Sequence, residues 1–192
     1  KAKEFVRATL EGAGFNTILE REVPTDAKGI NKRSEKYQLP IYQWVFLKDE
    51  GCTTQQFDRK IHDALLEIEA EAYTNNALAG FYPLSFSCRT QVLKGRLNSW
   101  EIIPYFCDLS HSSHEVSSLY FHTRFSTNTD PHPTMAQPFR LMAHNGELNT
   151  DKKNRLSETA VASAKNKFII RPPGQSDSCR LDQTLTSRVY EE

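Results

Sequence analysis

An arginine, Arg124, lies between Phe121 and Phe125 in FHTRFSTNT at residues 121–129, part of a segment that we expect to form a buried strand. A buried guanidinium must be paired, because an isolated charge in the protein interior is strongly unfavourable. Arg124 can therefore form a structural salt bridge, or it can hold the carboxylate of a ligand through two parallel hydrogen bonds. The local pattern leaves both interpretations open.

An Asn-Gly pair follows a second apolar stretch, in LMAHNGELNT at residues 141–150. Such a pair at the end of a strand is typical of a tight turn. Glycine also lets the backbone approach a ligand closely. The side-chain amide of Asn145 beside the backbone N–H of Gly146 would form an oxyanion hole for acyl transfer.

An aspartate between two serines marks a third stretch, GQSDSCRLD at residues 174–182. Asp177 is typical of a helix N-cap or of an acid in the first helical turn; it can also hold the ammonium group of a ligand. An arginine, an aspartate and a pair of amide donors together suit an amino acid with a carbonyl group at its far end. Glutamine is such a molecule.

The composition restricts the class of protein. The chain has 192 residues, of which 38% are hydrophobic and 25% charged, so we expect a single domain over residues 1–192. The formal net charge is zero, which gives no reason to expect a nucleic acid or an anionic membrane as partner. No apolar run reaches transmembrane length, and the first ten residues lack the apolar core of a signal peptide. Four scattered cysteines favour a reducing, cytoplasmic setting.

Hydrophobic periodicity predicts helices at the two ends of the chain and strands between them, an α+β pattern with a layered sheet. The expected helices cover residues 1–11, 54–73 and 151–166, with a last helix capped by Ser178. The expected strands are 15–23, 41–47, 78–88, 91–97, 117–127 and 139–144, with a polar loop at 24–38. No glycine-rich phosphate-binding motif supports a nucleotide fold.

The stretches FHTRFSTNT, AQPFR, AHNGELNT and GQSDS, in this order, resemble the class II glutamine amidotransferase domain of the glutamate synthase large subunit. The upstream segments LPIYQWVFLK, FYPLSFSCRTQVLKGRL and YFCDL, together with the expected helix at 54–73, follow the same order. The resemblance covers about residues 15–185.

The resemblance implies a four-layer αββα sandwich of the N-terminal-nucleophile hydrolase type and hydrolysis of glutamine to glutamate and ammonia. It assigns the substrate α-carboxylate to Arg124, the α-ammonium to Asp177 and the oxyanion hole to Asn145 and Gly146. Further residues at matching positions, which we expect to shape the pocket, are Ser126, Thr127 and His144.

The nucleophile of that family is an N-terminal cysteine, whose free α-amine titrates near pH 8 and can act as its base. Residue 1 here is Lys, and the family's first strand is expected to be missing from the sequence. Neither Cys88 nor Cys179 matches the position of the nucleophile, so we identify none in the chain. His111 and His114 lack a third ligand nearby, and we expect no metal site.

Two functions stay open at this point. In the first, the chain is most of a glutaminase domain whose N-terminal segment lies outside the sequence. It would deliver ammonia to a synthase domain or subunit, and FMN and an iron–sulfur cluster would belong only to such later domains. In the second, the protein is a relative without a nucleophile, which binds glutamine or glutamate as a sensor or scaffold. Loss of a central strand would leave an apolar sheet edge open, which favours the first.

Overall fold

The structure is a computed structural model and describes residues 1–124, 133, 136–144, 148, 152–165, 167, 169–170 and 176–191. Its α-helices are α1 (Ala2–Gly12), α2 (Lys32–Glu35), α3 (Thr54–Thr74), α4 (Ile102–Tyr105), α5 (Lys152–Ala164) and α6 (Asp177–Glu191). Its strands are β1 (Asn16–Glu22) and β2 (Tyr42–Leu47). The 3-10 helices are η1 (Ala27–Gly29), η2 (Asn76–Leu78), η3 (Ser99–Glu101) and η4 (Cys107–Ser110).

Helix α3 is the centre of the fold, and it confirms the helix predicted at 54–73. A capping box starts it: the backbone N–H of Gln56 donates to Thr53 Oγ1 at 3.2 Å, and the Thr53 N–H donates to Gln56 Oε1 at 2.9 Å. The apolar stripe of α3 then packs against α1 and the strands. The buried residues of this core are Val6, Leu10, Phe15, Phe57, Ile61, Ala64 and Ile68.

The strands β1 and β2 form an antiparallel pair in which Asn16 lies opposite Leu47 and Glu22 opposite Tyr42. They confirm the strands predicted at 15–23 and 41–47. The ring of Phe46 on β2 packs against Phe15 with 4.8 Å between ring centroids. This contact joins the sheet to the core that α1 and α3 share, because aromatic rings bury a large apolar area.

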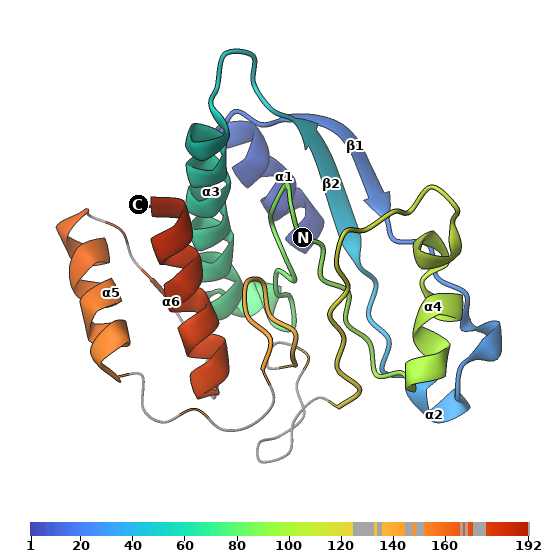
Figure 1. The fold of residues 1–192 in the computed structure, drawn as a ribbon. Coiled ribbons are helices and arrows are strands. Elements are labelled where there is room, and N and C mark those ends of the chain that lie inside the picture. Colours follow the sequence, from blue (N-terminus) through green and yellow to red (C-terminus); the bar gives the residue numbers. More distant parts are fainter. Residues whose placement is uncertain are drawn as a thin grey trace.

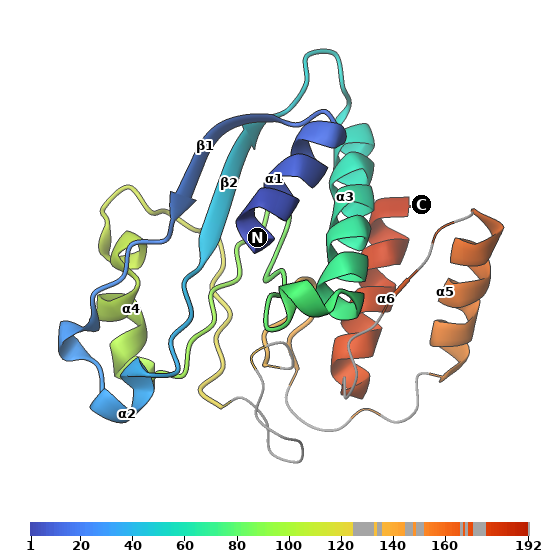
Figure 2. The same ribbon diagram turned by 180° about the vertical axis from the view of Figure 1, so that it is seen from behind.

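The helices lie side by side next to this hairpin (Figure 1). Helix α1 lies between the hairpin and α3, α6 lies along the other side of α3, and α5 lies beyond α6. The reverse view in Figure 2 shows the same order. Helices α1 and α5 confirm the predictions at 1–11 and 151–166. None of the helices in the described ranges is long and apolar enough to cross a lipid bilayer.

The other predicted strands are wrong over the residues that the structure describes. Residues 81–97 run as irregular coil, in which the Val92 N–H donates to the Ser85 hydroxyl at 3.1 Å. Residues 139–144 contain a turn closed by the Phe139 N–H and the Met142 carbonyl at 2.9 Å. A β-branched or aromatic sequence needs a neighbouring strand to pair with, and in the described part of the chain these segments have none. The four-layer sandwich stays a prediction, which the mixed helix and sheet content does not contradict.

The polar stretch 24–38 was predicted as a loop, and it also contains the short helices η1 and α2. Asp26 caps η1 by accepting the Lys28 N–H at 2.9 Å, and Asn31 caps α2 by accepting the Arg33 N–H at 2.8 Å. Short polar side chains favour such capping positions because they satisfy otherwise unpaired N–H groups.

The packing around α3 leads to a test of stability. Ile61 is 2% exposed in the core, so Ile61→Ala should lower the free energy of unfolding by about 2–5 kcal/mol, through lost burial and the cavity left behind. Ile103 on α4 is 56% exposed, and Ile103→Ala should cost less than about 1 kcal/mol. Urea unfolding followed by circular dichroism measures both; equal losses would contradict the assignment of this core.

Candidate functional site

Helix α6 carries one of the predicted ligand contacts at its first residue. Asp177 opens the helix, and Ser176 precedes it as the cap: the Ser176 hydroxyl accepts the Cys179 N–H at 3.2 Å. The prediction of Ser178 as cap is therefore wrong by two residues. Asp177 is an acid of the first helical turn, where the helix dipole stabilises its negative charge.

His144, the last described residue before the Asn-Gly pair, contacts Ser178, the residue after Asp177 on α6. Its Nε2 lies 2.6 Å from the Ser178 hydroxyl oxygen, within hydrogen-bonding distance. Its backbone N–H donates to Gln137 Oε1 at 2.8 Å. Ser178 is 8% exposed and His144 is half-buried, so this contact is partly shielded from water. Both ends of His144, backbone and ring, are thereby held in one orientation.

Asp182 holds the backbone just before His144. This carboxylate is 4% exposed and accepts three consecutive backbone N–H groups, from Arg140 at 3.2 Å, Leu141 at 2.8 Å and Met142 at 2.8 Å. A buried carboxylate needs such donors, since an unsatisfied buried charge is very costly. Asp182 and Ser178 lie one helical turn apart, so one face of α6 contacts residues 140–144 at two points.

The side chain of Arg140 reaches in the opposite direction, to α3. Its Nη2 lies 2.7 Å from Glu69 Oε1 and also donates to the Pro83 carbonyl at 3.2 Å. Burial alone would lower the pKa of the Arg140 guanidinium, but the neighbouring Glu69 carboxylate, with a further contribution from Tyr73, raises that pKa above its usual value. Arg140 therefore stays charged, and it ties residues 136–144 to α3.

A lysine completes this buried cluster. Lys94 donates through Nζ to the Ala136 carbonyl at 2.8 Å, and the ammonium lies 5.5 Å from the centre of the Phe139 ring. Burial lowers the pKa of Lys94 to about 8. A cavity of about 40 Å³ lies among Lys94, Arg140, Cys179 and Asp182, which is room for about one water molecule.

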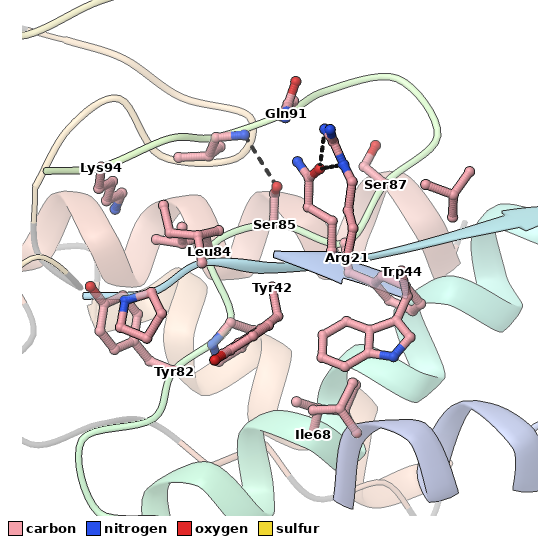
Figure 3. Close-up of a pocket in the computed structure, with 18 of the residues that line it drawn as sticks. Arg21, Tyr42, Trp44, Ile68, Tyr82, Leu84, Ser85, Ser87, Gln91 and Lys94 are labelled. Carbon is pink, nitrogen blue, oxygen red and sulfur yellow. Dashed lines mark hydrogen bonds between the residues drawn. The ribbon is translucent and has the colours of Figure 1, made fainter. Parts of the chain in front are cut away.

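A much larger groove, of about 980 Å³, runs on the other side of this cluster (Figure 3). We use "the groove" for the space between residues 39–46, α1, α3 and the coil at 80–94. Its walls combine apolar side chains, such as Trp44 and Ile68, with the polar pair Arg21 and Gln43, joined at 2.7 Å. The groove and the small cavity share part of their lining, namely residues 82–84 and Lys94. These residues therefore separate the two spaces.

The remaining predicted site residues are not brought together by the described part of the chain. Arg124 was expected inside an apolar strand, but residues 115–124 are exposed and contain no strand. Its backbone N–H donates to His122 Nδ1 at 2.9 Å. The expectation of a buried arginine is therefore wrong for Arg124, because this segment has no strand partner in the described ranges. The predicted residues Ser126, Thr127, Asn145 and Gly146 lie outside the described residues.

Sequence reasoning missed the residues that anchor the site: Glu69, Lys94, Gln137, Arg140, Ser178 and Asp182. Arg140 could have been found, because it is a charged residue within the apolar stretch FRLMAH, the same signal that drew attention to Arg124. Asp182 gave no such signal. An acid on a helix of mixed polarity is usually solvated, and only the fold brings three backbone donors to it.

Comparison with known proteins shows which family the chain belongs to. Residues 1–187 match the family described as class-II glutamine amidotransferases. The chain belongs to that family. It is 32% identical to ferredoxin-dependent glutamate synthase 2 of Synechocystis sp. over 96% of this chain, and 34% identical to ferredoxin-dependent glutamate synthase of Antithamnion sp. over 99%. It is also 32% identical to the large chain of glutamate synthase [NADPH] of Azospirillum brasilense over 70% of this chain.

This amidotransferase chain spans only a small part of those relatives. It covers 12% of the Synechocystis protein and 13% of the Antithamnion protein. Membership in the class-II family implies the N-terminal-nucleophile hydrolase fold, which the mixed helix and sheet content does not contradict. The family assignment thus confirms the resemblance drawn from the four motifs.

The low pKa of Lys94 gives the amidotransferase chain a testable dependence of stability on pH. Between about pH 8 and the ordinary lysine pKa, the unfolded chain binds the proton that the folded chain has lost, so stability rises with pH. The rise is at most about 1.4 kcal/mol per pH unit. Lys94→Met removes it, and the stability of the wild type relative to this variant should increase from pH 8 to pH 10.

Urea unfolding at pH 7, 8, 9 and 10 measures the difference in free energy of unfolding between the wild type and Lys94→Met. The contributions of the other titrating groups are common to both proteins and cancel in this difference. The exposed Lys48 provides a matched control, since Lys48→Met should leave the pH dependence of the wild type unchanged. A constant difference between wild type and Lys94→Met over this range would show that Lys94 keeps its proton in the folded protein.

Proposed function

We propose that this chain is the glutaminase part of a glutamate synthase-type enzyme, hydrolysing glutamine to glutamate and ammonia. The observation that carries the proposal is the family match over residues 1–187, together with 32% and 34% identity to ferredoxin-dependent glutamate synthases. The geometry around α6 supports it, because Asp177 and His144 come from distant parts of the sequence and meet through Ser178.

The proposed substrate contacts follow the chemistry of glutamine. Arg124 binds the α-carboxylate through its two-pronged guanidinium, and Asp177 accepts hydrogen bonds from the α-ammonium. Asn145 and Gly146 donate to the oxygen that becomes negative during attack on the amide, and this stabilises the tetrahedral intermediate. Ser126, Thr127 and His144 shape the pocket around the side chain.

None of the four cysteines of the chain suits the role of nucleophile. Burial raises the pKa of the Cys88 thiol, with a further contribution from Asp58, whereas a nucleophile needs a thiolate. Cys179 lines a cavity of about 40 Å³, too small for glutamine. Cys52 precedes α3 and Cys107 begins η4, and their thiols donate weakly to the nearby carbonyls of Thr53 and Tyr105. The proposal therefore assigns the nucleophile to a cysteine outside these 192 residues.

The groove supports this assignment, because it offers room for an additional strand. It runs along β2, and within the described residues the sheet contains only β1 and β2. An unpaired edge carries N–H and C=O groups that a further strand can bind. Apolar side chains such as Val6, Leu10 and Ile68 line the groove from the two helices below. A nucleophile-bearing strand in the groove would be held by β2 on one side and by these helices beneath.

The proposed reaction has two steps. A cysteine thiolate attacks the side-chain amide carbon of glutamine, the carbon–nitrogen bond breaks, and the nitrogen takes up a proton and leaves as ammonia. Water then hydrolyses the thioester, which releases glutamate and restores the thiol. The ammonia would pass to a synthase domain or subunit, and any FMN or iron–sulfur cluster would belong there, not to this domain.

Covalent labelling tests the nucleophile. Incubation of the full-length protein with 6-diazo-5-oxo-L-norleucine, an electrophilic glutamine analogue, should add one label at an N-terminal cysteine and abolish ammonia release. Peptide mass spectrometry locates the label, and an excess of L-glutamine should protect the cysteine from it. A protein that binds glutamine but neither takes the label nor releases ammonia would instead be the nucleophile-less sensor or scaffold.

Arg124 allows a test of the substrate contacts that does not depend on the nucleophile. Arg124→Ala should weaken the binding of L-glutamate by roughly tenfold to a hundredfold, because the α-carboxylate loses a charge-assisted pair of hydrogen bonds. Isothermal titration calorimetry measures the dissociation constant. The exposed Arg33 on α2 provides the control, and Arg33→Ala should bind like the wild type. Unchanged affinity of Arg124→Ala would exclude this residue from the site.

A further inference from the structure

Two residues that are consecutive to proposed substrate contacts bind each other. Ser178 directly follows Asp177, the proposed partner of the α-ammonium, and His144 directly precedes Asn145, the first proposed oxyanion donor. Nε2 of His144 and Oγ of Ser178 lie 2.6 Å apart. The hydrogen bond therefore links the residue after the proposed α-ammonium contact to the residue before the first proposed oxyanion donor.

Other contacts already hold the segment around His144, so the hydrogen bond with Ser178 acts only locally. Asp182 already holds the backbone of residues 140–142, and Arg140 is tied to Glu69 on α3. The segment would keep its general position without Ser178. What the Ser178 hydroxyl adds is a fixed distance between the first turn of α6 and the ring of His144.

That distance matters because the two proposed contacts bind opposite ends of one molecule. Glutamine and asparagine, or glutamate and aspartate, share the same α-carbon groups and differ by one methylene in the reach of the side chain. A pocket that is displaced by about 1 Å can lose about a hundredfold in effectiveness. One methylene is worth about 10–200-fold in selectivity when the pocket is well defined.

We propose that Ser178 is a positioning residue that sets the length of the amino acid accepted by the site, through its hydrogen bond with His144. This inference rests on the proposed function, since it takes Asp177 and the Asn145–Gly146 pair as the two ends of the glutamine site. Loss of the hydroxyl releases the ring of His144 from the first turn of α6. The site then discriminates poorly between side chains of five-carbon and four-carbon amino acids.

The test compares L-glutamate with L-aspartate, which differ by that methylene and are not hydrolysed. Isothermal titration calorimetry on the full-length protein gives the ratio of their dissociation constants. We expect the wild type to prefer L-glutamate, and Ser178→Ala to lose at least threefold of this preference. General damage to the fold would weaken both ligands alike and leave the ratio unchanged.

Ser187 provides a matched control on the same helix. Ser187 is 7% exposed, close to the 8% of Ser178, and its hydroxyl donates to Glu158 Oε1 on α5 at 3.0 Å, so Ser187→Ala removes the hydroxyl of a similarly buried serine elsewhere on α6. This variant should keep the preference of the wild type. If Ser178→Ala does not fold, the nearly isosteric Ser178→Cys takes its place, and its weaker hydrogen bond should also lower the ratio.

The outcomes separate the two proposals. In one outcome, the wild type binds L-glutamate and the Ser178 variant keeps a ratio of dissociation constants within threefold of the wild-type ratio. This result would overturn the role of Ser178 and leave the proposed function intact. A wild type that binds neither L-glutamate nor L-glutamine overturns the proposed function, and the role of Ser178 with it. An equal loss of the ratio in Ser187→Ala would also overturn the inference, because the effect would then not be specific to the contact with His144.

Discussion

A carboxylate buried among backbone N–H groups determines how the two halves of the chain meet. Asp182 lies on α6, nearly inaccessible to water, and accepts the N–H groups of three consecutive residues from 140 to 142. Such a charge is unfavourable in the interior unless donors surround it. The donors exist only when the segment before His144 adopts its observed turn. Helix α6 and this segment therefore stabilise each other, and neither arrangement is favourable alone.

Buried hydrogen bonds also fix how α6 is aligned with α3 and α5. Gln183 of α6 donates to Glu69 of α3 at 3.4 Å, while Thr184 and Ser187 donate to Glu158 of α5, each at 3.0 Å. Apolar side chains alone would allow these helices to slide or rotate against one another with little penalty. Buried hydrogen bonds allow only one alignment, because any other leaves polar groups unsatisfied. The alignment matters here, since α6 carries Asp177, the proposed partner of the α-ammonium, and Ser178, which contacts His144.

The helices and the hairpin could be predicted from the sequence because their signals are local. The stripe of α3 and its capping box, and the aromatic and β-branched residues of β2, each specify an element within its own length. The segments 78–97 and 117–124 carry equally apolar sequences, yet the structure forms no strand there. Strand formation depends on a neighbour elsewhere in the chain, which a local pattern cannot reveal. For the same reason Arg124 was predicted to be buried, and Arg140, which is the buried one, was overlooked.

The site and the groove are mechanically connected through the coil between them. The Pro83 carbonyl accepts a hydrogen bond from Arg140, and the neighbouring side chains of Tyr82 and Leu84 line the groove. Lys94 likewise lines the groove, while its ammonium holds the Ala136 carbonyl. A segment bound in the groove would therefore contact residues such as Lys94, which anchor segment 136–144. A strand carrying the proposed nucleophile would thus do more than supply a thiol: it would also support the residues that anchor the segment before the proposed oxyanion donors. Close packing transmits such support over several residues, because protein interiors leave little free volume.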